Sequence, residues 1–466
     1  MDSSLKETSN AIRPGAGSRI VGRAVAGSLA LAVAIIAGEG PCDIYAKAGT
    51  PCVGAFSTTR ALYADFNGPL IQVRDSASNK TKDIYPIAPG GVINKASIDS
   101  FVKGKGSISM LYDQSPKKNH LPPSPRCNYL EAGLESDLSK GQTKLDGNTV
   151  PGIYITGASP ADVWVSRRIK NVAYRNNAAK GTATGNQAET MYMVVDGKRY
   201  SEPCCFSYGN GETTGNDDGN GTMESIYWGT NISWGGPGEG KGPWIAADLE
   251  NGMYKSDRGG HTSSVTSPNN KTINVSYASL FLKGPAADSF GLKAGDAQTG
   301  KLTTMWNGKR PTPNYYPKKL QGAIFLGTGG DGSPGGTGTF YEGVITIGNP
   351  PDSIDDQIQA NIVAAGYGRQ ISTVAPRYAD RARASLLHSP SRSVAIVEYD
   401  ASQTGRVDLE VASLSGKRMA RISHPDPSVG THQIAWDAST APGGLYALRL
   451  TRDAKVLWTG QVLIER

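Results

Sequence analysis

The sequence has few of the residues that most metal-dependent and triad hydrolases require. Only five histidines occur in 466 residues, and they stand singly along the chain, so neither a metal cluster nor a serine triad is indicated. A Gly-x-Ser-x-Gly nucleophile elbow is also missing. The net charge is +7, but no run of Lys and Arg alternates with aromatic residues, and nucleic-acid binding therefore has little support.

Long apolar runs are equally scarce. The one notable run is Ala24–Ala37, AVAGSLALAVAIIA, which is uncharged and follows a polar segment with four basic side chains. It has the length of a signal-peptide core and falls short of the roughly 20 residues that a membrane-spanning helix needs. We therefore expect residues 1–40 to be a signal peptide, the protein to be secreted or attached to the cell surface, and no segment to span a membrane.

Cysteine is rare, with five residues in the chain. Cys42 and Cys52 lie ten apart around a Gly- and Pro-containing turn, a spacing that suits a small disulfide-closed loop. Cys204 and Cys205 are adjacent: a reducing compartment would leave them as two small hydrophobic side chains, whereas an oxidising one could join them in a vicinal disulfide. Export favours disulfides. Cys127 would then stay unpaired, and we assign it no role.

Helical patterns are few as well. Many short apolar segments alternate with turn residues, including 58 glycines, and this pattern predicts an all-β fold. The one convincing helix is Ser353–Ala365, where Ser353 and Asp356 match a capping box and Gly366 follows the last turn.

The chain after the signal segment divides into three parts. Residues 41–368 form one large predicted domain, and residues 369–392 are a basic linker that we interpret as a solvated tether. Residues 393–466 alternate polar and apolar residues in six or seven short segments, which predicts a small immunoglobulin-like (Ig-like) sandwich. Its LSGK, WDAS and PGGLYALRL segments resemble C-terminal modules of bacterial secreted enzymes that serve in sorting or surface attachment, so secretion or cell-surface machinery is an expected partner.

One segment, Gly242–Asn251 (GPWIAADLEN), combines an aromatic residue with two carboxylates. Read as a strand, it points Ile245, Ala247 and Leu249 into a core and presents the other set on the opposite face: Trp244, Ala246, Asp248 and Glu250. Carbohydrate sites need such a mixture of ring-stacking surface and carboxylates. Periodicity alone favours the simpler alternative, a strand whose outer face is merely hydrated.

A second candidate is the glycine-rich loop with Asp331 between two apolar segments of Ala323–Thr346. Its GTGGDG sequence matches Gly-x-Gly-x-x-Gly but leads to a strand and not to a helix, so a dinucleotide site is not indicated. Asp331 is either an ordinary turn aspartate or a carboxylic acid on a loop whose glycines let a substrate approach the backbone.

Several motifs occur in one order along the chain: GPCDIYAKAGTPCVGAFSTTRALY, LYDQSPKKNHL, YRNNAAKGTATGNQAETMYMVVDG, CCFSYGNGET, GPWIAADLEN and GGDGSPGGTGTFYEGVIT. Together they resemble the catalytic domain of the α-L-arabinofuranosidase B family, glycoside hydrolase family 54, over residues 40–368. The resemblance implies a concanavalin-like β-sandwich and a secreted, retaining hydrolase without metal or cofactor. Such an enzyme would release terminal non-reducing α-L-arabinofuranosyl residues from plant cell-wall polysaccharides such as arabinoxylan and arabinan.

The resemblance also implies roles for individual residues. Glu250 would be the nucleophile and Asp331 the general acid/base, which for retention requires their carboxyl groups to lie about 5–5.5 Å apart. Hydrogen bonds to the sugar are expected from Asp248, Asn251 and the backbone of Gly330. The pocket would be walled by Trp234 and by a disulfide between Cys204 and Cys205.

The sequence departs from the family in three places. A second small disulfide near FVKGKGSISM is missing, the segment from Trp234 to Glu250 is one residue longer, and the C-terminal arabinose-binding β-trefoil is replaced by the Ig-like module. A non-catalytic sugar-binding protein is an alternative function, because such sandwiches also serve as lectins, but a lectin has no use for Asp331. A side activity on β-xylosides is a third hypothesis.

Overall fold

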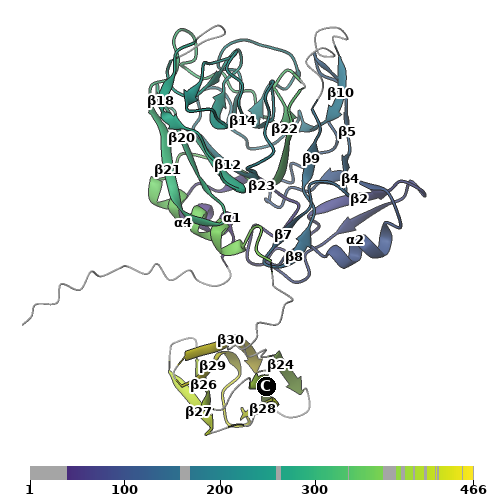
Figure 1. Ribbon diagram of the computed structural model, residues 1–466, viewed down its shortest axis with the longest axis vertical. Helices are drawn as coiled ribbons and strands as arrows, with labels where there is room; N and C mark the ends of the chain where they lie inside the picture. Colours follow the sequence, from purple (N-terminus) through teal and green to yellow (C-terminus); the bar gives the residue numbers. More distant parts are fainter. Residues whose placement is uncertain are drawn as a thin grey trace, which may run out of the picture. The chain divides into compact units, whose positions relative to one another are not determined.

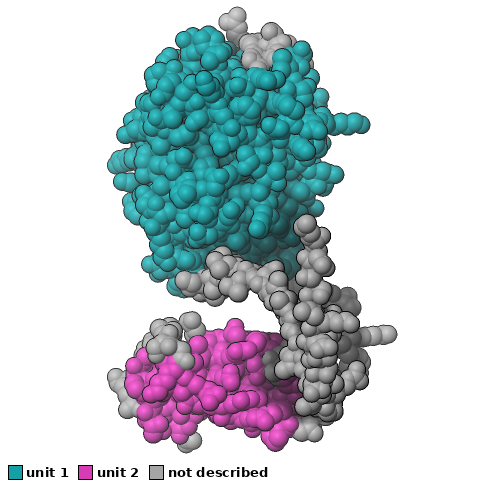
Figure 2. All heavy atoms as spheres, turned by 90° about the vertical axis from the view of Figure 1, so that its left-hand side faces the viewer, with its two compact units in different colours: residues 1–370 teal, residues 371–466 magenta. Residues whose placement is uncertain are grey.

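The computed structural model describes residues 39–157, 168–258, 264–333 and 335–370, and parts of the remainder: 385–389, 394–401, 405–413, 417–425, 427, 430–453 and 455–464. The chain divides into two compact units between Gln370 and Ile371 (Figure 2). The core of the predicted signal peptide lies outside the described residues, as does most of the predicted linker.

The first unit is built on two large β-sheets (Figure 1). A seven-stranded sheet has the order β1 (Cys52–Ser57), β23 (Gly338–Ile347), β12 (Glu189–Asp196), β19 (Tyr277–Gly284), β20 (Phe290–Asp296) and β21 (Thr299–Gly308), with β9 (Ile153–Ile155) also paired to β23. A six-stranded sheet has the order β11 (Tyr174–Asn176), β22 (Ala323–Thr328), β13 (Ser207–Gly211), β14 (Glu224–Gly229), β16 (Trp244–Asp248) and β17 (Met253–Tyr254). Side chains from both sheets form one hydrophobic cluster, so the unit is a β-sandwich.

Smaller strands surround the sandwich. A four-stranded sheet has the order β3 (Thr81–Ile84), β2 (Ile71–Asp75), β4 (Gly106–Leu111) and β6 (Ser136–Asp137). Two parallel pairs and one hairpin complete the unit: β10 (Ile169–Val172) with β5 (Leu130–Leu134), β15 (Gly238–Glu239) with β18 (Ser267–Lys271), and β7 (Thr143–Leu145) with β8 (Asn148–Val150).

Among the described residues, three segments are helical: α1 (Pro41–Lys47), α2 (Lys95–Phe101) and α4 (Asp352–Ala365). The predicted helix is confirmed as α4, and Gly366 ends it with a φ of 78°. The predicted capping box is wrong, because the N-cap is Pro351 and no side chain caps the helix. We missed α1 and α2, which are too short for a full apolar stripe. None of the described helices has the length and apolarity needed to cross a membrane.

The central strands of the seven-stranded sheet are buried on both faces, so β12 is buried at seven successive positions, whereas the edge strand β21 is largely exposed. One face packs on the six-stranded sheet, and the other is covered by helices and neighbouring loops. On the covered face the Tyr192 ring stacks on Tyr45 of α1, and Ile358 and Ile362 of α4 join the core. The predicted disulfide between Cys42 and Cys52 is present and joins α1 to β1.

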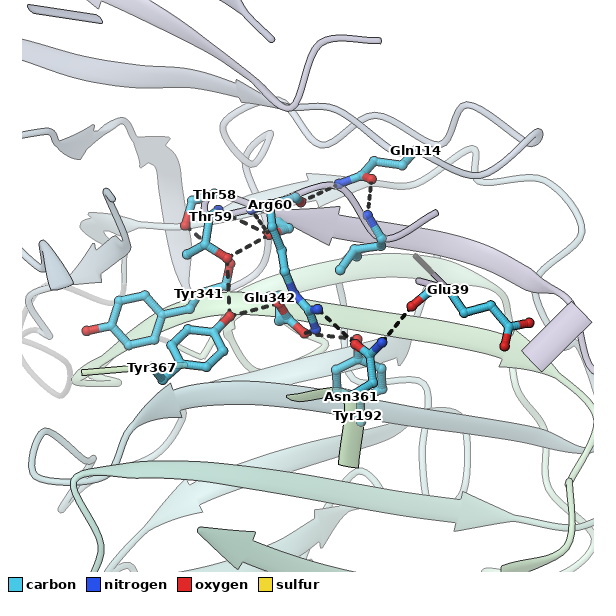
Figure 3. Close-up of polar contacts among 12 residues, drawn as sticks. Glu39, Thr58, Thr59, Arg60, Gln114, Tyr192, Tyr341, Glu342, Asn361 and Tyr367 are labelled. Carbon is cyan, nitrogen blue, oxygen red and sulfur yellow. Dashed lines mark hydrogen bonds and ion pairs between the residues drawn. The ribbon is translucent and has the colours of Figure 1, made fainter. Parts of the chain in front are cut away.

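The same covered face contains a buried ion pair (Figure 3). The Nε and Nη2 atoms of Arg60 each donate to a carboxylate oxygen of Glu342, both at 2.7 Å, and its Nη1 donates to Asn361 Oδ1 at 2.8 Å. The hydroxyl groups of Tyr367 and Tyr192 donate to the same carboxylate at 2.8 and 3.2 Å. Every oxygen and nitrogen of the pair therefore has a partner. We call these five residues the Arg60–Glu342 network.

The second unit contains two antiparallel sheets around its own hydrophobic cluster. One sheet has the order β24 (Ser385–Ser389), β25 (Val394–Ala401) and β28 (Gly430–Asp437), and the other β27 (Arg418–His424), β26 (Val407–Ser413), β29 (Gly444–Arg452) and β30 (Lys455–Ile464). The all-β prediction is thus confirmed for both units. Strand β24 lies inside residues 369–392, so this sheet begins within the segment that we expected to be a linker.

Candidate active site

The face of the six-stranded sheet that points away from the main core carries a row of buried residues that runs from a cation to a carboxylate. Strand pairing places Arg175 beside Phe325, Phe325 beside Gly209, Gly209 beside Ser225, and Ser225 beside Asp248. At about 4.8 Å per strand, the row spans roughly 19 Å. Its three middle positions are Phe325, Gly209 and Ser225, and a Cβ atom at Gly209 would lie 2.6 Å from the backbone of the next strand. The two positions next to Asp248 therefore carry only small side chains.

Asp248 ends β16, and Glu250 follows it in a tight turn. The core-facing half of our strand prediction is confirmed, because Ile245, Ala247 and Leu249 are all fully buried in the main cluster. The strand does not continue through Glu250, however, and this part of the prediction is wrong. Glu250 and Asn251 have φ values of 62° and 56°, so the chain reverses there through left-handed conformations. Such conformations are uncommon for residues other than glycine and often mark functional sites.

Asp331 lies on the loop that follows β22, and this loop folds back over the sheet. A Cβ atom at Gly211 would lie 3.4 Å from the Cα of Gly330, which places the loop directly above β13. The Asp331 Oδ1 atom accepts hydrogen bonds from the backbone N–H of Ser333 at 2.8 Å and from the Ser333 hydroxyl. Asp331 thus shapes its own turn, as the ordinary interpretation expects, while its carboxyl group stands on the site face.

Cys204 and Cys205 are joined in a disulfide, as predicted, and lie against the same loop. Cβ atoms at Gly335 and Gly336 would lie 2.5 and 2.2 Å from the carbonyl oxygens of Cys204 and Cys205, so glycine is required at both positions. On the other side, Cys205 forms a small apolar cluster with Tyr227, Ala246 and Met253, joined by Cys204 and the partly buried Trp234. Ala246 precedes Asp248 on the same face of β16, so the sulfur atoms and Trp234 border the carboxylates.

The carboxyl groups at this site are buried and repel one another. Asp248, Glu250 and Asp331 are exposed by only 6%, 5% and 8%. Burial, followed by the charges of Glu212, Asp331 and Asp248, raises the pKa of Glu250 to about 11. Burial raises the pKa of Asp248 to about 7 against a 3.0 Å hydrogen bond from Ser207, and burial also raises the pKa of Asp331. A shared electrostatic environment therefore links the three carboxyl groups that the sequence singled out.

The remaining predicted residues lie beside this group. Asn251 follows Glu250 directly; its Nδ2 atom donates to Asp217 Oδ1 at 3.2 Å, and its carbonyl oxygen accepts from the Tyr315 hydroxyl at 3.2 Å. The Trp234 backbone N–H donates to Asn231 Oδ1 at 3.2 Å. The fold thus brings every predicted site residue to one region. It does not by itself assign their roles.

Sequence reasoning missed two charged residues in this region, Glu212 and Arg175. Glu212 is fully buried after the end of β13, and burial raises its pKa to about 7 against a hydrogen bond from Thr222. Arg175 is 1% exposed, and its guanidinium lies 5.5 Å from the centre of the Phe325 ring. Both residues occur in motifs that we quoted, GNGET and YRNN. Only the register of the strands, however, shows that they meet the carboxylates.

Comparison with known proteins places the larger unit in a family. The sequence model for "Alpha-L-arabinofuranosidase B, catalytic" matches residues 41–368. A probable α-L-arabinofuranosidase B of Aspergillus fumigatus is 44% identical over 344 residues, which is 72% of this chain and 64% of that protein. An arabinofuranosidase/β-xylosidase of Trichoderma koningii is 40% identical over 83% of this chain and 74% of its own length. The chain therefore spans just under two thirds of the first relative and about three quarters of the second.

Solved structures agree with the sequence matches. A GH54 α-L-arabinofuranosidase soaked with a cyclic sulfate inhibitor superimposes with a TM-score of 0.65 at 35% identity, covering 85% of this chain and 74% of that one. An arabinofuranosidase complexed with arabinofuranosyl-α-1,2-xylobiose matches with the same TM-score and coverage at 34% identity. The prediction of a glycosidase family is confirmed: this chain belongs to the α-L-arabinofuranosidase B family and contains its catalytic domain.

Proposed function

We propose that this protein is a secreted, retaining α-L-arabinofuranosidase that releases terminal non-reducing arabinofuranosyl residues from plant cell-wall polysaccharides. The observation that carries the proposal is the match of residues 41–368 to the family's catalytic domain, with buried carboxyl groups gathered on one sheet face. The relative crystallised with arabinofuranosyl-α-1,2-xylobiose supports an arabinoxylan-type substrate. Arabinan is a second candidate polymer of the same sugar.

In the proposed reaction, Glu250 attacks the anomeric carbon as a carboxylate while Asp331 gives its proton to the leaving oxygen. Water, deprotonated by the same Asp331, then attacks the glycosyl ester and releases arabinose. Burial keeps Asp331 protonated to higher pH than an ordinary aspartate, which suits a general acid. That proton also removes one of the charges that raise the pKa of Glu250. The positive charge that develops on the sugar ring then stabilises the Glu250 carboxylate.

The surrounding residues suit the binding of one small sugar ring. The sulfur atoms of Cys204 and Cys205, with Trp234, offer an apolar wall against which a furanose ring can lie. Asp248, Asn251 and the backbone of Gly330 would supply hydrogen-bonding groups for the sugar hydroxyls. The separation of about 5–5.5 Å between the Glu250 and Asp331 carboxyl groups, which retention requires, stays a prediction.

The second unit and the N-terminal segment complete the proposal. We interpret the two-sheet second unit as an Ig-like module that serves in sorting or surface attachment. Its own small hydrophobic core and its division from the first unit as a separate compact unit are consistent with this interpretation. The apolar segment Ala24–Ala37 supports export. Expression with and without residues 393–466, followed by a cell-fractionation assay, tests whether this module retains the enzyme at the surface.

The decisive experiment measures nitrophenol release from 4-nitrophenyl α-L-arabinofuranoside. Wild type is expected to turn over the substrate, and Glu250→Ala and Asp331→Ala are expected to lose most of that activity. Equal turnover by all three proteins would reject the assigned roles. No turnover by wild type, together with binding of arabino-oligosaccharides, would favour the alternative of a non-catalytic sugar-binding protein.

A second activity, on β-xylosides, is favoured by one comparison. The Trichoderma koningii relative is named an arabinofuranosidase/β-xylosidase. If the same pocket serves both substrates, Glu250→Ala will abolish both activities, and arabinose will competitively inhibit 4-nitrophenyl β-xyloside hydrolysis. Loss of only one activity would show that the two substrates are hydrolysed at different sites.

A further inference from the structure

Glu212 is a buried carboxyl group that the proposed reaction does not use. It has no exposed surface, and its Oε1 atom accepts one hydrogen bond from the Thr222 hydroxyl at 2.6 Å. Its Oε2 atom is buried without a hydrogen-bond partner. Burial of a polar atom without a partner costs about 1–3 kcal/mol, and more when the group is charged. A merely structural position would be better occupied by an apolar or amide side chain.

The Arg175 charge lowers the pKa of this carboxyl group, but its guanidinium bonds to neither carboxylate oxygen. Arg175 directs its Nη2 atom to the main-chain carbonyl oxygen of Glu212, and its Nε atom to Asn177 Oδ1. Its Nη1 atom is buried without a partner. The contrast with Arg60 is direct, because that guanidinium uses two nitrogen atoms on one carboxylate. The Glu212 charge is therefore left to act on its neighbours.

Glu212 lies directly beneath the loop that carries Asp331. A Cβ atom at Gly330 would lie 2.0 Å from Glu212 Oε2 and 2.8 Å from Met223 Sδ. The carboxyl group thus packs on the Cα of Gly330, the residue that precedes Asp331. Gly211 leaves space for the same loop from below. The height of this loop above the sheet is consequently determined by Glu212 and by two glycines.

We propose that Glu212 is a positioning residue for the proposed reaction: it supports the Asp331 loop, and its negative charge sets the pH at which the Glu250 carboxyl group ionises. The inference rests on the proposed function. The charged and titratable groups around it are Arg175 on β11, Asp331 after β22, Asp248 and Glu250 at the end of β16, and Asp217 and Cys127 on adjoining loops.

The order of charge effects supports this role. Among the neighbouring charges, Glu212 raises the pKa of Glu250 more than Asp331 or Asp248 does. Burial raises the pKa of Glu212 itself to about 7. Replacing it by a neutral isostere must therefore lower the pKa of Glu250. The acidic limb of kcat/KM, which reports ionisation of the nucleophile in the free enzyme, should move to lower pH.

The test compares Glu212→Gln with wild type by the pH dependence of kcat/KM on 4-nitrophenyl α-L-arabinofuranoside. We expect the acidic limb to move down by about one pH unit, the shift typical of one removed neighbouring charge. Glu189→Gln is the matched control: it is equally buried, and burial and then the Glu224 charge raise its pKa to about 8, but it lies on β12 in a separate cluster. This control should leave the limb in place.

An unmoved limb in Glu212→Gln, or an equal shift in Glu189→Gln, would overturn the inference while leaving the proposed function intact. An inactive wild type would overturn both. A second measurement does not depend on turnover: a double-mutant cycle of Glu212→Gln and Glu250→Gln in thermal unfolding between pH 6 and about 11. The coupling should grow towards the upper end of this range, where Glu250 joins Glu212 in the ionised form. Absence of coupling at every pH would contradict the role of the charge.

Discussion

Two buried groups of charged side chains in the first unit follow opposite rules. In the Arg60–Glu342 network each carboxylate oxygen accepts two hydrogen bonds, and each guanidinium nitrogen donates to Glu342 or Asn361 (Figure 3). On the site face, Arg175 interacts electrostatically with Glu212, Asp331 and Glu250, and Glu212 Oε2 and Arg175 Nη1 have no hydrogen-bond partner. The first arrangement minimises the free-energy cost of burying charged groups, whereas the second arrangement leaves much of that cost in place.

The electrostatic consequences differ accordingly. Burial alone would lower the pKa of Arg60, but Glu342 outweighs this effect and the pKa is raised, so Arg60 keeps its positive charge. Burial and mutual repulsion raise the pKa of Glu250, Asp248 and Glu212 into or above the neutral range. The network thus joins remote segments of the chain, whereas the site group holds protons that a glycosidase can transfer.

The largest expected effect concerns proton donation at the site. Asp331→Asn removes the proposed general acid, so hydrolysis of an arabinoxylan oligosaccharide should fall by about 10²–10⁴-fold. Nitrophenolate leaves without protonation, so the first step on the nitrophenyl substrate should be affected much less. Steady-state and burst kinetics on both substrates measure the difference. An equal loss in the rate of the first step on the two substrates would assign Asp331 a role in binding or folding and not in acid catalysis.

Next in size is the loss of stability from breaking the network. Glu342→Gln leaves Arg60 buried without its counter-ion, and the free energy of unfolding should fall by about 3–5 kcal/mol. Urea denaturation of the first unit measures this. Lys95→Ala, which breaks a surface pair with Asp99, is the control and should cost under about 0.5 kcal/mol. Turnover per folded molecule should be unchanged in both variants. A loss of kcat in Glu342→Gln would show that the active site depends on the network.

The two groups also differ in how far the sequence could predict them. Cys204 and Cys205 are adjacent, and Asp248 and Glu250 are two residues apart, so local motifs identified these side chains. Periodicity also gave the buried half of β16. It could not give the reversal at Glu250, because a left-handed turn leaves no trace in polar–apolar alternation.

Long-range pairs were beyond the reach of sequence patterns. Arg60 and Glu342 are 282 residues apart, and nothing local to either residue distinguishes it from a solvated charge. Glu212 and Arg175 reach the site only through the order and register of β11, β22 and β13. The helix α4 was predictable because fourteen residues carry a full stripe, while α1 and α2 acquire their stability from packing.

A smaller expected effect is that the carboxyl groups of the site make the stability of the protein depend on pH. Because the pKa values of Asp248 and Glu250 are raised on folding, the folded state binds more protons than the unfolded state above about pH 4. Stability should therefore be greatest near pH 4 and fall as pH rises, for Asp248 until about 7 and for Glu250 until about 11. Glu250→Gln removes part of this decline, so it should unfold at a higher temperature than wild type at pH 8.

The control for that experiment is Asp137→Asn, which changes an exposed carboxylate away from the site. It should give no gain at pH 8. Thermal unfolding of the three proteins at pH 4, 6 and 8 measures the trend, and the Glu250→Gln advantage should shrink towards pH 4. A constant advantage at all three pH values would point to relief of the strained turn at Glu250 and not to its charge.

The smallest effect compares single hydroxyl groups. Tyr367→Phe removes one hydrogen bond to the Glu342 carboxylate, and Ser207→Ala removes one to Asp248. A lost hydrogen bond to a charged group costs about 1.5–3 kcal/mol, so Tyr367→Phe should lower stability by that amount at pH 8. Ser207→Ala should cost less, because Asp248 can keep its proton instead of remaining ionised without a donor. Its effect should appear in the KM for the nitrophenyl substrate, since Asp248 is proposed to bind the sugar. If urea denaturation gave equal losses of stability for the two variants, the Asp248 carboxyl group would depend on its hydrogen-bond donor as strongly as the Glu342 carboxyl group does. The site group and the network would then not differ in how they hold buried carboxyl groups.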